Sequence, residues 1–545
     1  MRLRTLLTNV HGLKSTLIKI FSLSMVIEAS NLLLPIGSQL VMDHVIFAGD
    51  HELLSLICIG LLFFILFRTG VSMLRSWISI VMETLIDIQW KAGVFDHLMK
   101  LPLAYFEKRK LGDIQSRFGS LDIIRSTFTT NIVISIVDSI MSVGVFIMML
   151  LYGGWLVWVV LGFTVLYVIL RLSTYQYYRQ IAEEQLVKGA KASSHFMESL
   201  YSIGTLKTLG LSETRSQYWL NLNVETINAG IKLTKMNMMF GGLNTFIATC
   251  DQIIILWLGA SLVIDNQMTI GMFVAFNAYR GQFSQRASSL IDVMLKLRML
   301  SLHNERVADI VLSQPEKQLP NRQFFSSGKA VNFEVRNLSY QYDNFSKPII
   351  KDFNLSIRAG ESVAIAGPSG GGKTTLMKLM CGLLAPDSGM ILVDGVDIYN
   401  IGVNNYRQCI ACVLQDDKLL SGSIAENISG FDSELDLRRI ESCAKRCNIH
   451  DDIQRMPMGY ETLVGELGGS LSGGQKQRLL IARALYRRPS ILFMDEATSH
   501  LDLENEAIIN QAIAQLKITR IIIAHRQSTI SSADRIISLE AAGVN

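Results

Sequence analysis

A glycine-rich stretch in the second half of the chain has residues suited to holding phosphate. Residues 367–374 read GPSGGGKT, between an apolar run and an amphipathic stretch. Glycines let backbone amides converge on a phosphate at a helix N-terminus, where the helix dipole favours anions. Lys373 would then reach the β- and γ-phosphates of a nucleotide, and the Thr374 hydroxyl would bind Mg²⁺. The predicted phosphate loop comprises Gly367, Pro368, Ser369, Gly370, Gly371, Gly372, Lys373, Thr374 and Thr375.

Polar residues follow three further apolar runs, at Gln415, at Asp495-Glu496 and at His525. Asp495 could hold Mg²⁺, and Glu496 could polarise an attacking water. Gln415 could contact metal and water, and His525 could reach the γ-phosphate. Because ligands of α/β sheets bind at the carboxyl ends of the strands, we expect these residues to gather at one sheet edge. The pattern predicts ATP hydrolysis, with Glu496, His525 and Gln415 catalytic, Thr374, Gln415 and Asp495 as metal ligands, and Tyr342 stacking on the adenine.

The elements that must position these residues fall into two halves. The mean hydropathy is +0.31, yet the long apolar runs lie before about residue 300, whereas residues 331–545 alternate β-rich and α-rich stretches. We predict an all-α membrane domain of six helices followed by an α/β P-loop nucleotide-binding domain. The expected domains are residues 1–312, a linker at 313–330, and 331–545. A net charge of +4 is too small to indicate a nucleic-acid partner.

Six apolar segments are long enough to span a bilayer, near residues 17–46, 52–80, 132–152, 155–174, 238–263 and 268–290. The windows 41–66, 133–170 and 238–279 contain no Lys or Arg. The positive-inside rule therefore places both termini in the cytoplasm. Two long cytoplasmic excursions follow, with turns expected at residues 116–124 and 202–210.

Charged and polar residues inside the apolar segments are costly in lipid. Glu28, Asp138, Asp251 and Gln252 are therefore expected to face an internal cavity as candidate substrate contacts, or to form interhelical hydrogen bonds.

The seven cysteines are odd in number and irregularly spaced, which favours reduced thiols over a disulfide framework. Cys409, Cys412, Cys443 and Cys447 could form a metal site. Their placement on a predicted strand and a predicted helix favours plain packing instead.

A second glycine-rich stretch, SLSGGQKQRLLIARA at 470–484, lacks a P-loop lysine. Together with the phosphate loop and FMDEATSHLD it resembles the signature of ATP-binding cassette (ABC) proteins. The resemblance implies that two cassettes face each other head to tail, so that Ser472, Gly473, Gly474 and Gln475 of one chain close over ATP held by the other. One copy of each motif implies a homodimer with two ATP sites. His500 stands where the family commonly has Ala, and a packing role is expected for it.

The membrane half is similar to the exporter type, and residues 116–124 and 202–210 resemble its coupling helices. TLVGELG at 462–468 resembles an exporter-specific loop. The stretches LLLPIGSQLVMDHVIFAGDHELL and FEKRKLGDIQSRF look most like peptidase-containing bacteriocin exporters of the microcin/colicin V type. Those begin with a Cys-protease domain, which is not expected here because no cysteine precedes Cys58.

The resemblance implies a homodimeric, ATP-hydrolysing exporter of a bacteriocin-like peptide in the bacterial inner membrane. A periplasmic adaptor and an outer-membrane channel are its implied partners. A lipid or drug exporter is the alternative, because the scaffold does not fix the cargo. A nucleotide-sensing regulator that does not transport is a further alternative, against which Glu496 and His525 argue.

Overall fold

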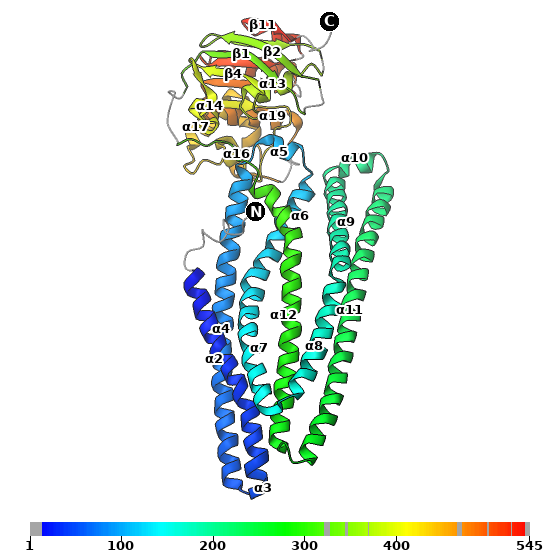
Figure 1. Cartoon of the computed structure of the whole chain (residues 1–545). Helices are drawn as coiled ribbons and strands as arrows, with labels where there is room; N and C mark the ends of the chain where they lie inside the picture. The colour runs from blue at the N-terminus through cyan, green and yellow to red at the C-terminus, as the bar shows by residue number, and fades with distance from the viewer. Residues whose placement is uncertain are drawn as a thin grey trace. The chain divides into compact units, whose positions relative to one another are not determined.

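The computed structural model describes residues 13–320, 328–343, 347–368, 370–465, 471–498, 501–524 and 526–539. The chain forms two compact units (Figure 1). Residues 1–101 and 105–315 form the first, here called the helical unit, and residues 102–104 and 316–545 form the second, here called the sheet unit. Ser369, His500, His525 and residues 466–468 of the predicted exporter loop lie outside the described residues.

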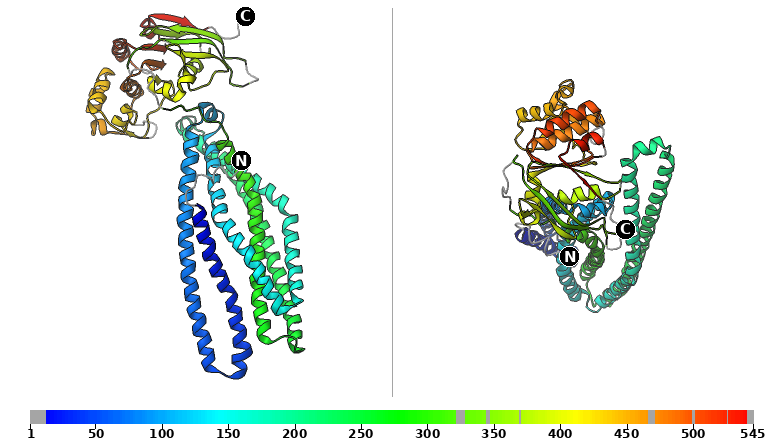
Figure 2. Two further views of the ribbon diagram at one scale, coloured as in Figure 1. Left: turned by 60° about the vertical axis from the view of Figure 1, so that its left-hand side comes forward. Right: turned by 90° about the horizontal axis from the view of Figure 1, so that it is seen from above.

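The helical unit consists of long helices that run side by side (Figures 1 and 2). In chain order, the long helices and the short elements between them are α2 (Leu13–Leu40), the π-helix η1 (Val41–Val45), α3 (Ile46–Ala48), α4 (His51–Met99), α5 (Leu103–Glu107), α6 (Leu111–Ser126), the π-helix η2 (Thr127–Asn131), α7 (Ile132–Gly153), α8 (Leu156–Ser173), α9 (Tyr175–Tyr201), α10 (Ile203–Thr208), α11 (Ser212–Ile264) and α12 (Ile270–Val311). The first residues of α5, 103 and 104, belong to the sheet unit.

Among the described residues, five helices are long and apolar enough to cross a membrane, within 15–45, 51–99, 135–153, 156–173 and 212–264. The sixth predicted span falls in α12, which is a continuous helix of 42 residues but is not among these five. Arg280 and Arg286 lie within that segment and make it more polar than the others. The count of six apolar spans is therefore not confirmed, although the sixth segment is helical.

The helices α4 and α11 continue well beyond the lengths that a bilayer requires, with 49 and 53 residues. The expected turn at 202–210 is present, because α9 ends at Tyr201 and the short α10 leads into α11. The expected turn at 116–124 is wrong, because these residues are helical within α6. The chain turns earlier, after Met99, where Pro102 cannot donate a helix hydrogen bond.

Three acidic residues of the predicted spans, Glu28, Asp138 and Asp251, pair with arginines of α12. Arg280 Nη1 donates to Asp251 Oδ2 at 2.7 Å, and both residues are buried. Arg286 donates to Glu28 and, at 3.1 Å, to Asp138 Oδ1. Interhelical bonding is thus the role the structure shows for all three carboxylates. Asp251 and Gln252 in addition line a cavity of about 400 Å³. For these two residues, the expectation that they face a cavity therefore agrees with the structure.

The sheet unit contains a parallel sheet of five strands in the order β11-β3-β10-β9-β6 and an antiparallel sheet in the order β2-β1-β4-β5. Its strands are β1 (Phe333–Tyr340), β2 (Ile350–Ile357), β3 (Ser362–Ala366), β4 (Ser388–Val393), β5 (Val396–Asp397), β6 (Ile410–Val413), β7 (Gly422–Ser423), β8 (Leu463–Val464), β9 (Ile491–Asp495), β10 (Thr519–Ile523) and β11 (Arg535–Ser538). Its helices are α13 (Lys373–Met380), α14 (Ile398–Ile401), α15 (Val403–Cys409), α16 (Ile424–Ser429), α17 (Leu437–Arg446), α18 (His450–Gln454), the 3₁₀ turn η3 (Gly459–Glu461), α19 (Gly473–Tyr486), α20 (Leu503–Ala514) and α21 (Gln527–Ser531). The predicted mostly parallel sheet is therefore confirmed, while the antiparallel sheet was not foreseen.

The central strands β3, β9 and β10 of the parallel sheet are buried on both faces, as apolar runs such as ILFM require, whereas the edge strand β11 is largely exposed. One core lies around β3, β9 and the antiparallel sheet, and another around α16, α17 and α19. Cys443 and Cys447 are buried in the second core. Cys412 Sγ lies 3.0 Å from Cys381 Sγ rather than near those two. No group of three or more potential metal-binding His, Cys, Asp or Glu side chains occurs in the part of the chain that the structure describes.

Candidate nucleotide site

Four neighbouring parallel strands bring the predicted site residues to one edge of the sheet. The phosphate loop follows β3, the position of His525 follows β10, Asp495 ends β9, and Gln415 comes two residues after β6. The register fixes their level, because Ile523 at the end of β10 is opposite Asp495 at the end of β9. Residues that are more than 150 positions apart in sequence, such as Gly367 and Ala524, are therefore brought to the same sheet edge.

The phosphate loop has the backbone that its glycines allow. Gly370 and Gly372 have φ of +80° and +84°, in the left-handed region that favours glycine. A Cβ on Gly372 would lie 2.7 Å from Ile349 Cγ2, so the position is closed to larger residues. The Lys373 ammonium donates to the carbonyl oxygens of Gly367 and Pro368, both at 2.9 Å. The lysine is thereby held against the loop at the N-terminus of α13, where phosphate would bind.

The predicted magnesium and water ligands converge at the ends of β9 and β6. Asp495 is fully buried, and Glu496 has φ of +51°, which turns the chain sharply after the strand. The Glu496 N–H donates to the Ile523 carbonyl at 3.0 Å. Gln415 Nε2 lies 3.4 Å from Glu496 Oε2, so the amide and the carboxylate are neighbours. The structure thus brings together Gln415, Asp495 and Glu496 as the sequence predicted.

Two residues that the sequence analysis missed support this edge from α19. Gln477 Nε2 donates to the Glu496 carbonyl at 3.5 Å. Arg483 donates to the Lys418 carbonyl at 3.1 Å and lies 3.7 Å from Asp417, in the loop after Gln415. Burial raises the pKa of the Asp417 carboxyl. Polar side chains on the otherwise apolar stretch after SLSGG were the signal that could have indicated these contacts.

Tyr342 lies beside the phosphate loop, because its hydroxyl is 3.3 Å from Thr375 Oγ1. Its ring packs edge-on against Tyr340, with centroids 5.2 Å apart. The second face of the ring is the part that an adenine could use, and that role remains a prediction.

The signature residues form a capped helix N-terminus. Ser472 Oγ accepts from the Gln475 N–H at 3.2 Å, and Gln475 Oε1 accepts from the Ser472 N–H at 3.0 Å, which closes a capping box on α19. Gly473 and Gly474 are the first residues of this 14-residue helix. Among the described residues, no hydrogen bond or ion pair joins residues 472–475 to the phosphate loop. In the part of one chain that the structure describes, the two phosphate-binding elements are therefore not bonded to each other.

Comparison with known proteins matches both units. The family model for the ABC transporter transmembrane region covers residues 17–286, and the model for the ABC transporter covers residues 350–499. The solved structure of a bacterial Atm1-family ABC exporter with ATP bound has a TM-score of 0.85 and covers 97% of this chain and 95% of its own, at 24% identity. That likeness shows the exporter fold.

Curated relatives are much closer in sequence. The chain is 62% identical, over 98% of its length and 77% of the relative, to the probable microcin-H47 secretion/processing ATP-binding protein MchF of Escherichia coli. It is 59% identical, with the same coverage, to the colicin V secretion/processing ATP-binding protein CvaB of Escherichia coli. The toxin RTX-I translocation ATP-binding protein of Actinobacillus pleuropneumoniae is 35% identical over 95% of this chain and 73% of that protein. The chain therefore belongs to the ABC transporter family, as an exporter.

Membership confirms the predicted class. The chain is a membrane protein whose helical unit is joined to an ATP-binding cassette, and it couples ATP hydrolysis to transport across the membrane.

Proposed function

We propose that this chain is a homodimeric exporter that moves a small bacteriocin-type peptide out of the cytoplasm. The observation that carries the proposal is the 62% and 59% identity, over 98% of the chain, to proteins named for the secretion of microcin H47 and colicin V. Similarity at this level extends over the helical unit as well as the cassette. A lipid or drug cargo would not account for that kinship.

The proposed assembly follows from the single copy of each phosphate-binding element. Among the described residues of one chain, no hydrogen bond or ion pair joins the signature at 472–475 to the phosphate loop, and each contains exposed residues. A two-fold pair places the signature of one copy over the loop of the other, so that the Gly473 and Gly474 amides meet the γ-phosphate. ATP then joins the two cassettes, and its hydrolysis releases them.

In the proposed mechanism, each residue of the sheet edge has one task. Lys373 leaves the Gly367 and Pro368 carbonyls to reach the β- and γ-phosphates. Glu496 holds the attacking water and accepts its proton, while Gln415, 3.4 Å from that carboxylate, orients the same water. His525 contacts the γ-phosphate, and Tyr342 stacks on the adenine.

A magnesium ion fits the oxygen atoms that these residues offer. Thr374, Gln415 and Asp495 supply a hydroxyl, an amide oxygen and a buried carboxylate, which are ligands that Mg²⁺ prefers. When bound, the ion neutralises charge on the β- and γ-phosphates. A bound cation would offset the cost of burying the Asp495 carboxylate at the end of β9.

The membrane location follows the charge distribution. We place the chain in the bacterial inner membrane with both termini in the cytoplasm, because the windows 41–66, 133–170 and 238–279 contain no Lys or Arg. The far side is then where a periplasmic adaptor and an outer-membrane channel would receive the peptide.

A transport assay with the purified chain in proteoliposomes tests the proposal. ATP-dependent uptake of a Gly-Gly-leader bacteriocin precursor, and of its leaderless form, is measured beside the Glu496→Gln variant. Uptake of either peptide that the variant loses supports peptide export. Normal ATPase activity without uptake of either peptide, but with stimulation by lipids or drugs, would overturn the cargo assignment.

A further inference from the structure

The helical unit contains a cavity of about 960 Å³ between α6, α9, α11 and α12. Its size is at the upper end of ligand pockets, which span roughly 300–1,000 Å³. All of its lining residues lie outside the six predicted spans. Most belong to the two predicted cytoplasmic excursions, and Leu302, Glu305 and Arg306 follow the sixth span on the same side. Six cationic and four acidic side chains line it, so its walls carry both signs of charge.

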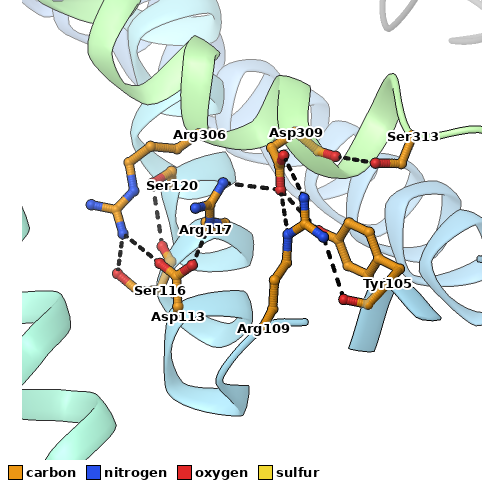
Figure 3. Close-up of polar contacts among 9 residues, drawn as sticks. All are labelled: Tyr105, Arg109, Asp113, Ser116, Arg117, Ser120, Arg306, Asp309 and Ser313. Carbon is orange, nitrogen blue, oxygen red and sulfur yellow. Dashed lines mark hydrogen bonds and ion pairs between the residues drawn. The ribbon is translucent and has the colours of Figure 1, made fainter. Parts of the chain in front are cut away.

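One wall of the cavity is occupied by charges that already have partners (Figure 3). Arg109 and Arg117 of the α5–α6 region both bind Asp309 of α12, at 2.9 Å and 3.0 Å. Arg306 of α12 donates to Ser116 Oγ at 2.8 Å. These contacts hold α6 against α12 and leave little capacity for a ligand.

Other charges of the lining have no such partners. Lys108 and Lys191 make no ion pair within 4.0 Å among the described residues, and neither do Glu183 and Glu305. They come from the α5–α6 loop, from α9 and from α12, and they are exposed. The cavity thus offers two free ammonium groups and two free carboxylates.

His195 of α9 is a second, independent indication of a ligand. It is 7% exposed and lines the cavity, and its ring packs against Tyr218 of α11 in a tilted arrangement, with ring centroids 4.9 Å apart. Neither ring nitrogen has a hydrogen-bond partner among the described residues. Burial, with the nearby Arg215, lowers the pKa of His195, so the ring is neutral near pH 7 and has one donor and one acceptor. Buried polar groups are normally satisfied, so an unsatisfied imidazole facing a cavity calls for a partner.

We propose that this cavity is a docking site for a charged, extended segment of the peptide cargo on the cytoplasmic side. The inference rests on the proposed function. A peptide carries ammonium and carboxylate side chains on a backbone of donors and acceptors, which matches the unpaired lysines, the unpaired glutamates and the neutral imidazole together. A lipid headgroup or a free anion would match only part of this lining.

The test measures peptide binding to the full chain in lipid nanodiscs without nucleotide. Fluorescence anisotropy of the peptide is the readout. The probe is a labelled synthetic Gly-Gly-leader bacteriocin precursor. We expect Lys108→Gln with Lys191→Gln, and Glu183→Gln with Glu305→Gln, each to weaken binding about tenfold. His195→Ala should weaken binding, and His195→Gln, which keeps a donor and an acceptor, should bind close to wild type.

A charge exchange separates docking from a structural role. The variant Lys108→Glu with Lys191→Glu should prefer a peptide whose acidic residues are replaced by lysine, which a merely destabilised protein would not do. Lys235→Gln with Glu213→Gln is the matched control, because both side chains are exposed and outside the cavity lining. Basal ATPase activity should stay unchanged in the control variant.

The outcomes distinguish this inference from the function on which it rests. If the wild-type chain transports the peptide but the cavity variants bind it as tightly as wild type, the docking site is wrong and the exporter stands. If the wild-type chain neither binds nor transports the peptide while it hydrolyses ATP, the peptide cargo itself is wrong.

Discussion

The two units hold their polar residues in place by different means. In the helical unit, Asp251 and Glu28 are held by arginines 29 and 258 positions away, through ion pairs between helices. In the sheet unit, Lys373 is held by the carbonyls of Gly367 and Pro368 just before it, and Glu496 by a backbone bond to Ile523 at the end of the neighbouring strand. Residues that are placed by loops and strand ends can be predicted from sequence motifs. Residues that are placed by helix packing cannot, because the sequence does not show which helices pair.

The largest effect should come from the chemical site. Glu496→Gln removes the group that we expect to accept the proton of the attacking water, and ATPase activity should fall by about 10²–10⁴-fold. Glu504→Gln, in the first turn of α20, is the matched control and should keep full activity. Steady-state phosphate release measures both. Activity within a few-fold of wild type for Glu496→Gln would mean that another group accepts the proton.

The buried ion pairs should give the next largest effect, on stability rather than on chemistry. Asp251→Leu leaves Arg280 buried without its partner and should cost about 3–5 kcal/mol of unfolding free energy. The double variant with Arg280→Met should recover most of the loss. A denaturant series in mixed micelles measures the change.

An exposed pair provides the contrast to that result. Arg336 and Glu334 on β1 lie 2.8 Å apart at the surface, and Arg336→Gln should leave the unfolding midpoint nearly unchanged. Equal losses for Arg336→Gln and Asp251→Leu would contradict the distinction between the two kinds of ion pair.

Alanine substitutions at two glycines of the sheet unit distinguish the effect of backbone strain from the effect of a steric clash. Gly372 and Gly395 have φ of +84° and +81°, so alanine at either position should cost about 1–2 kcal/mol of stability. Only at Gly372 does a new Cβ meet another atom, Ile349 Cγ2 at 2.7 Å. Gly372→Ala should therefore also weaken ATP binding by about tenfold or more. Titration with a fluorescent ATP analogue would refute this if both variants bound alike.

The smallest changes in activity are expected for the two capping boxes, which have the same arrangement of hydrogen bonds. Ser423 caps α16, and Ser472 caps α19 at the signature. Each change to alanine should cost about 1 kcal/mol of stability. Only Ser472→Ala should raise the ATP concentration needed for half-maximal activity, because α19 is expected to face a phosphate and α16 is not. A shift of equal size for Ser423→Ala would indicate a general loss of stability instead.

Much of the fold could be predicted from local sequence. Apolar runs with the right length indicated the spans, and strand–loop–helix patterns indicated the sheet edge with Gln415, Asp495 and Glu496. The expected turn at 116–124 was wrong because Gly119 is tolerated inside α6, while the proline at 102 ends the helical run earlier. A glycine alone does not say whether a helix stops.

The sequence by itself determined the class of protein and the phosphate-binding chemistry, because the residues that create them are contiguous with the strands and helices that position them. Only the tertiary structure decided that Glu28, Asp138 and Asp251 pair with Arg286 and Arg280, and that His195 faces a cavity. Helical periodicity tells which face of a helix is polar, but which helix covers that face is settled by packing between segments far apart in the chain.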